Sequence, residues 1–122
     1  MIGSLMMRVS VVVLLVGMLA GMVMGIKQDF ILAPAHAHFN LIGGVLLFMF
    51  GLYYRLVPAA GTTALAKVQG WLHVSGAILF PAGVAIVLVK DASLIAVPIV
   101  GSLIVTVATA LFAVIVFRTS RA

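Results

Sequence analysis

Four long apolar segments constrain this chain more than any other feature. They run at about residues 5–26, 35–57, 64–89 and 92–117. A helix needs about 20 predominantly apolar residues to cross the hydrocarbon core of a bilayer, and each segment has that length. Hydrophobic residues make up 66% of the chain and charged residues 7%, whereas a soluble domain carries roughly 25% charged residues. The sequence therefore predicts an integral membrane protein.

The connections between the segments are short, and this predicts how the helices are arranged. They comprise residues 27–34, residues 58–63 and a turn at Lys90-Asp91. Short connections make successive helices run antiparallel. We therefore expect an all-α fold in which residues 1–122 form a single integral membrane domain, a bundle of four transmembrane helices.

Basic residues at the segment ends predict the orientation of the bundle. With the N-terminus inside, only Lys27 and Lys90 lie outside, and the other basic residues lie in the cytoplasm: Arg8, Arg55, Lys67, Arg118 and Arg121. The positive-inside rule then favours an N-in, C-in topology. Because the charges sit at segment ends, the net charge of +5 indicates lipid rather than nucleic acid as the partner.

Glycines recur every four residues along the first segment, at Gly17, Gly21 and Gly25. Such spacing leaves a flat stripe along one side of a helix, where another helix or a planar ligand can approach closely. Of these two interpretations, helix packing is the simpler.

Two histidines begin the second segment, within Pro34–Gly44, and they are the first candidates for chemistry. Imidazole is costly to bury in hydrocarbon without a partner. Positions i and i+2 of a helix point about 200° apart, so His36 and His38 face opposite sides and cannot readily grip one ion. On a regular helix Asn40 and Gly43 share the His36 side. Opposed imidazoles suit two haem contacts better than one zinc site, although an interfacial histidine can also simply bind water.

The third histidine, His73, lies some nine residues into the third segment, roughly 13 Å from its start and inside the hydrocarbon. Gln69 precedes it by four residues and shares its face. Gln69 either orients a metal-ligating His73, as groups behind ligating imidazoles do, or the two side chains satisfy each other. Pro81 predicts a kink further along this helix.

Absences also narrow the chemistry. The chain has no cysteine, so thiolate metal sites and covalent haem attachment are excluded. Its only acids, Asp29 and Asp91, fall in the connections. A proton-coupled exporter that depends on an intramembrane carboxylate is therefore not expected.

The run His36–Gly43 (HAHFNLIG), followed by Leu47–Pro58 (LFMFGLYYRLVP), resembles helix ten of the catalytic subunit of haem–copper oxidases and nitric oxide reductases. The C-type oxidases are the most similar, with His-x-His near the outer end, a glycine soon after, then Gly-x-Tyr-Tyr and a proline. The resemblance covers about 25 residues. That subunit has three pseudo-repeated groups of four helices, and helix ten is the second of its group, as here.

The resemblance implies non-covalent haem b, because one histidine of the family's pair ligates the high-spin haem and the other the low-spin haem. It implies that His36 and His38 are haem ligands, and that His73 occupies the place of a copper ligand. It further implies electron transfer or O2- or NO-related redox chemistry and a redox partner protein. With the N-in topology, the pair lies near the outer face of what we expect to be a bacterial inner membrane. Catalytic residues stay unassigned, and whether the chain is an oxidoreductase stays open.

The departures from the family are substantial. Its copper site takes three histidines, two of them adjacent, whereas His73 stands alone after Leu72. One chain also has a third of the family's helices. We therefore expect a homo-oligomer, and specifically a cyclic homotrimer in which His36 of one protomer and His38 of the next approach one haem. A monomer or dimer with interfacial histidines is the competing expectation.

Two further hypotheses come from other functional classes. The chain could be a non-catalytic membrane subunit of a larger complex, with its histidines serving only as polar contacts between helices. Alternatively, sparse histidines could serve a small transporter of metal ions. A haem spectrum discriminates both hypotheses from a haem protein.

Overall fold

The computed structural model describes residues 1–120 and consists almost entirely of helices, with no strand among those residues. Four helical segments are long and apolar enough to span a membrane: Ile2–Lys27, Ala33–Leu56, Ala64–Val89 and Ala92–Thr119. The expectation of an all-α protein with four candidate membrane spans is confirmed. Arg121, one of the basic residues used to predict orientation, lies outside the described residues.

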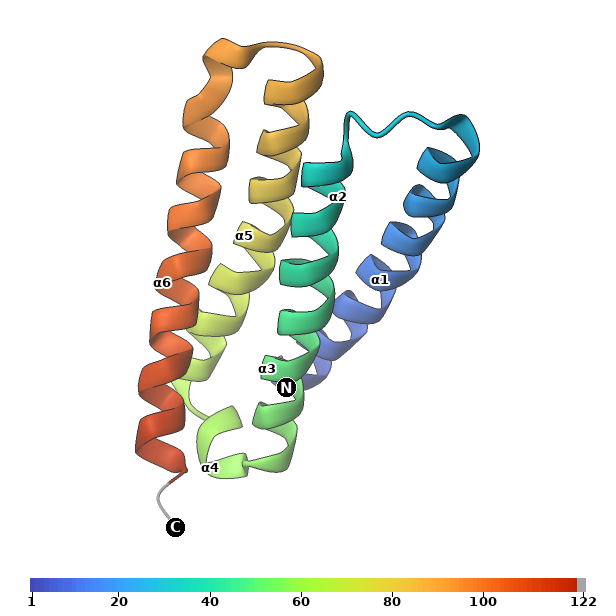
Figure 1. Ribbon diagram of the computed structural model, residues 1–122. Helices are drawn as coiled ribbons and strands as arrows, with labels where there is room; N and C mark the ends of the chain where they lie inside the picture. Colours follow the sequence, from blue (N-terminus) through green and yellow to red (C-terminus); the bar gives the residue numbers. More distant parts are fainter. Residues whose placement is uncertain (121–122) are drawn as a thin grey trace.

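Two of the four spans are subdivided (Figure 1). The first span is α1 (Ile2–Lys27) and the third is α5 (Ala64–Val89). The second comprises α2 (Ala33–His38), the π-helix η1 (Phe39–Leu46) and α3 (Leu47–Leu56). A short helix, α4 (Pro58–Gly61), leads from α3 to α5. The fourth span begins with the 3₁₀-helix η2 (Ala92–Ile95) and continues as α6 (Ala96–Thr119).

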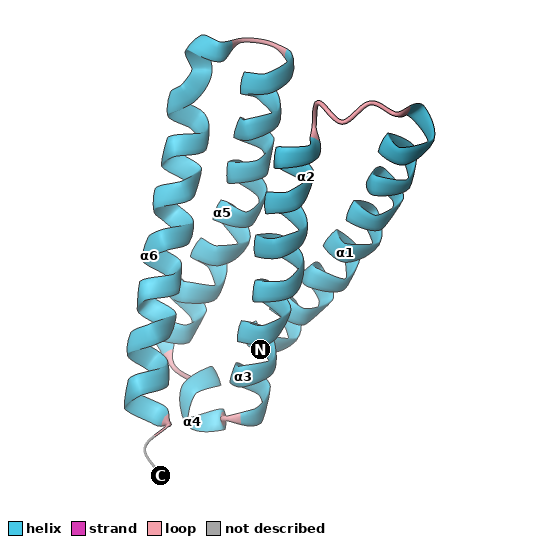
Figure 2. Ribbon diagram, viewed as in Figure 1, coloured by secondary structure: helices cyan, strands magenta, loops and turns pink. Residues whose placement is uncertain are grey.

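The loops that connect the helices lie at two opposite ends of the bundle, as Figure 2 shows. The N-terminus, α4 and the C-terminal end of α6 lie together at one end, which we call the terminal end (Figure 1). The connection from α1 to α2 and the turn from α5 to η2 lie at the other, which we call the histidine end. At the histidine end α1 diverges from α2, whereas α5 and α6 stay side by side.

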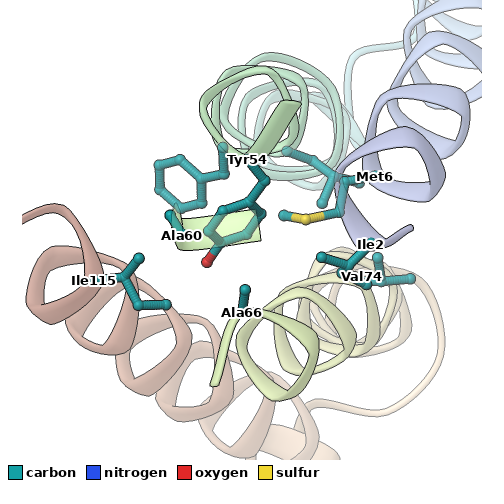
Figure 3. Close-up of a cluster of buried hydrophobic side chains, with 9 residues drawn as sticks. Ile2, Met6, Tyr54, Ala60, Ala66, Val74 and Ile115 are labelled. Atoms are coloured by element: carbon teal, nitrogen blue, oxygen red, sulfur yellow. The ribbon is translucent and has the colours of Figure 1, made fainter. Parts of the chain in front are cut away.

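The main buried cluster lies toward the terminal end, where Tyr54 of α3 points into the middle of the bundle (Figure 3). It joins α1, α3, α4, α5 and α6 through Ile2, Met6, Leu47, Phe50, Tyr54, Ala60, Ala66, Val74 and Ile115. Glycines let the backbones of α1 and α3 meet here: a Cβ on Gly3 would lie 2.7 Å from the carbonyl oxygen of Gly51. Tight packing at this end leaves the histidine end as the more open half of the molecule.

Candidate functional site at the histidine end

The segment after the histidine pair is a π-helix, which the sequence did not predict. In η1 the backbone pairs i with i+5 instead of i with i+4. Asn40 and Gly43 nevertheless contact α1, as His36 does: Asn40 lies against Gly17, and Gly43 faces Val13. Adjacent glycines let η1 approach two neighbours. A Cβ on Gly43 would lie 3.1 Å from Val13 of α1 and 3.6 Å from Ala77 of α5, and a Cβ on Gly44 would lie 2.9 Å from Leu14 Cγ. The turn between the histidines and the core is therefore wider than an α-helical turn.

His36 faces α1 and is held there by the backbone. Its Nε2 lies 2.8 Å from the carbonyl oxygen of Gly17, and because a carbonyl only accepts, Nε2 carries the proton. A Cβ on Gly21 would lie 3.0 Å from the same nitrogen, and one on Gly17 would clash with Asn40 Oδ1. Gly17 and Gly21 thus make room for the second span, in agreement with the packing interpretation, while Gly25 has no neighbour within 4 Å.

His38 faces α5 and is held differently. Its Nδ1 lies 2.6 Å from the carbonyl oxygen of Pro34, one turn earlier, so Nδ1 carries the proton and Nε2 presents its lone pair. The ring lies against Phe80 of α5, with centroids 4.6 Å apart. Between residues 1 and 120 no group hydrogen-bonds Nε2 of this half-buried ring.

The two imidazoles therefore contact different helices, as their spacing predicts, and differ in readiness for a metal. A metal-ligating histidine usually donates its other ring N–H to a carboxylate or backbone carbonyl, which fixes the tautomer and the ring. His38 has this arrangement, with Nε2 left over. In His36 the bond to Gly17 occupies Nε2, so that nitrogen ligates only after the bond opens. The donor set fits one axial haem ligand, His38.

A cavity of about 530 Å³ separates α1, α2 and α5 at this end. Small-molecule sites commonly enclose about 300–1,000 Å³. The lining is apolar apart from His36, and it comprises Ala20, Val23, Met24, Leu32, Ala35, His36, Phe39, Ile78, Pro81, Ala82 and Ala85. The cavity exists because four of its lining residues are alanines, whose side chains are too small to fill it. Pro81, which also lines it, lies within α5 without interrupting the helix. His36 thus borders a ligand-sized cavity, while His38 lies on the other side of α2.

His73 lies deeper, fully buried between α5 and η1. Its Nε2 is 3.0 Å from the carbonyl oxygen of Ile42, and the Phe50 ring meets it edge-on at 5.0 Å. Nδ1 has no partner. An unsatisfied buried acceptor such as Nδ1 costs about 1–3 kcal/mol. The hydrogen bond from Nε2 to the Ile42 carbonyl is the interaction that offsets this cost.

Gln69 and His73 do not pair, so both roles predicted for Gln69 are wrong. Its Oε1 accepts a hydrogen bond from the Tyr54 hydroxyl at 2.8 Å, and its Nε2 donates to the Ala108 carbonyl at 3.1 Å. Both Gln69 and Tyr54 are essentially excluded from solvent. The pair links α3, α5 and α6, and no pattern in the sequence indicates this contact.

A copper site at His73 does not fit the residues present. One imidazole nitrogen is committed to a carbonyl, and in the part of the chain that the structure describes no three His, Cys, Asp or Glu side chains gather to hold an ion. Copper prefers several imidazole or sulfur ligands. His73 is therefore better understood through the π-helix that it touches.

Fold and site together define a class: a helical protein with four candidate membrane spans and two histidines that face opposite sides of one span. No protein-family model, curated protein or solved structure matches the chain.

Proposed function

We propose that the chain is a haem-b-binding integral membrane protein that serves electron transfer or O2- or NO-related redox chemistry, with His38 as an axial ligand. One observation carries the proposal. His38 donates Nδ1–H to the Pro34 carbonyl and leaves Nε2 without a partner on a half-buried face. The resemblance of His36–Pro58 to helix ten of haem–copper oxidases supports the same assignment.

The chain's own residues would prepare this ligand in two ways. The Pro34 carbonyl keeps the proton on Nδ1 and so leaves the lone pair on Nε2, and Phe80 packs against the ring and limits its rotation. Haem b, when bound, supplies one-electron redox chemistry and a site for a diatomic gas. His36 borders the cavity on the opposite side and becomes a second ligand only if it releases Gly17.

The proposal includes assembly. His38 lies on a partly exposed face of α2, so a ligand held there would also meet lipid or a neighbouring protomer. We retain a cyclic homotrimer as the proposed assembly, with haem between protomers and a redox partner protein at the outer face. Within one protomer His36 points inward to α1, so bis-histidine ligation across an interface requires its bond to Gly17 to open. Native mass spectrometry in detergent, with haem quantified per chain, tests the trimer; a monomer with full haem occupancy refutes it.

We also propose an N-in, C-in orientation in a bacterial inner membrane, with the histidine end outside. Arg55, Lys67 and Arg118 lie in elements near the terminal end, and Lys27 and Lys90 near the histidine end. The positive-inside rule places the richer end in the cytoplasm. Because the chain has no cysteine, single cysteines introduced at Thr62 and Ser120 should be labelled from inside and one at Gln28 from outside. The reverse pattern refutes the orientation.

The test of function is a reduced-minus-oxidised absorbance spectrum of the protein purified after expression with haem available. Wild type should show the bands of a b-type haem. His38→Ala should lose or shift them, while His36→Ala, whose nitrogen is already bonded, should retain most of the haem. Equal spectra for wild type and the His36/His38 double alanine variant refute the ligand assignment. A haem-free wild type leaves the non-catalytic subunit as the better interpretation.

A further inference from the structure

Two side chains donate hydrogen bonds to carbonyls around the π-helix. Asn40 Nδ2 donates to the carbonyl of His36, 2.8 Å away, just before η1. His73 Nε2 donates to the carbonyl of Ile42, 3.0 Å away, in the middle of η1. π-turns are rare, and buried backbone carbonyls that lose regular pairing need other donors. The bond from His73 is the long-range one, because it comes from α5, another membrane span.

The side chain of His73 has one directed interaction and no other evident role in the site. The side chain is fully buried, its Nδ1 has no partner, and its ring contacts Phe50 only edge-on. An aliphatic side chain would fill similar space without the orphaned nitrogen. The one directed interaction of the ring is the bond to Ile42, which lies between the histidine pair and the core residues of α3.

We propose that His73 is a positioning residue: its hydrogen bond to Ile42 holds η1 in the π form and so fixes the direction in which α2 presents His36 and His38. The π form itself does not depend on haem. The functional meaning of the direction rests on the proposed function, since it matters for ligation only if the pair binds haem.

The geometry gives the size of the effect. Converting a π-turn into an α-turn shifts the helix register by about one residue, which corresponds to about 100° of rotation and 1.5 Å of translation. Since α3 is anchored in the core, α2 would rotate. His36 would leave the Gly17 carbonyl, and His38 would leave Phe80. The difference in exposure between Ala35, which is 7% exposed, and Ala37, which is exposed, would be lost or reversed.

The exposure of these two alanines provides a haem-independent readout. Single cysteines replace Ala35 or Ala37 in haem-free protein in detergent, and their reaction rates with a bulky maleimide are compared. With His73 present, the cysteine at position 35 should react at least tenfold more slowly than the one at position 37. His73→Leu, which lacks a donor, should abolish or invert this ratio. His73→Gln, whose amide N–H reaches about as far as Nε2, should restore it.

Two controls keep the result decisive. A cysteine at Ala108, which is fully buried, should stay protected in His73→Leu; if it reacts, the variant has unfolded, and the wild-type tautomer decides instead. Nitrogen-15 NMR of labelled histidine should show the proton of His73 on Nε2. A proton on Nδ1, or a folded His73→Leu variant with an unchanged ratio, overturns the proposal. If the ratio changes but no variant or wild type binds haem, the proposed function fails and the role of His73 in register stands.

Discussion

Removing the Tyr54 hydroxyl tests the buried pair that joins α3 to α5. Tyr54→Phe keeps the ring within the cluster of Figure 3 and deletes only the bond from the hydroxyl to Gln69 Oε1. The amide of Gln69 cannot turn to hide its oxygen, because its nitrogen donates to the Ala108 carbonyl. The variant therefore leaves a buried acceptor without a donor.

The expected loss in the free energy of unfolding follows from the burial of the pair and from its position between membrane helices. Tyr54 is 1% exposed and Gln69 is 0% exposed, so no water replaces the hydroxyl. An orphaned buried acceptor costs about 1–3 kcal/mol, whereas side-chain bonds between membrane helices average about 0.6 and reach about 1.7 kcal/mol. For this fully enclosed pair we expect a loss of about 1.4 kcal/mol in the free energy of unfolding, which is about tenfold in the unfolding equilibrium constant.

Tyr53→Phe is the matched control. The Tyr53 hydroxyl pairs with Thr119 Oγ1 at 2.7 Å, but Thr119 keeps its own bond to the Ile115 carbonyl and the site is only partly buried. Its removal should cost less than about 0.5 kcal/mol. Unfolding in mixed micelles with rising SDS, followed by the fluorescence of the single tryptophan, Trp71, measures both. Equal losses for the two variants would refute the reasoning, as would a double-mutant cycle of Tyr54→Phe with Gln69→Leu that shows no coupling.

Two further predictions concern helix packing and a loop carboxylate. Gly17→Leu should destabilise the protein by about 2 kcal/mol or more because its side chain meets Asn40, whereas Gly25→Leu on the same helix should be nearly neutral; similar SDS midpoints for both would contradict this packing. Hydrogen bonds from Ser93 lower the pKa of the Asp91 carboxyl, so its stabilising contribution is complete above the unfolded-state pKa of about 3.9 and is lost as pH falls through the lower folded value. An NMR titration should find the pKa of Asp91 below its usual value in wild type and raised part of the way toward it in Ser93→Ala, which loses the hydroxyl but keeps the backbone N–H bond to the carboxylate. An unchanged pKa in Ser93→Ala would show that the hydroxyl does not contribute to the shift.

Hydropathy and connection length were sufficient to predict the four helices, because membrane-spanning segments satisfy their own backbone groups. The opposed directions of His36 and His38 also followed from spacing, since both precede η1. The π-helix did not follow, because Gly43 and Gly44 only permit it and the donor at Ile42 comes from His73 on another span. A hydrogen bond from a side chain of one span to the backbone of another produces no repeating pattern in the sequence of either span.

The same reason explains the error at Gln69. Its spacing from His73 predicts a contact along one helix face, yet partners on α3 and α6 take both ends of the amide. The His-x-His pattern predicts both histidines as ligands, and the structure distinguishes them by their hydrogen bonds. The difference lies in two backbone carbonyls, those of Pro34 and Gly17, which the sequence cannot place.

The divergence of α1 from α2 gives the cavity beside His36 an unusual chemical context. Its walls are apolar and belong to membrane spans, so a molecule would reach it after dissolving in the bilayer. Occupancy then depends on the mole fraction of that molecule in lipid rather than on its concentration in water. Each added methylene favours transfer into lipid by about 0.8 kcal/mol, roughly a fourfold enrichment. Weak intrinsic binding would therefore suffice to fill the cavity with a strongly lipophilic compound.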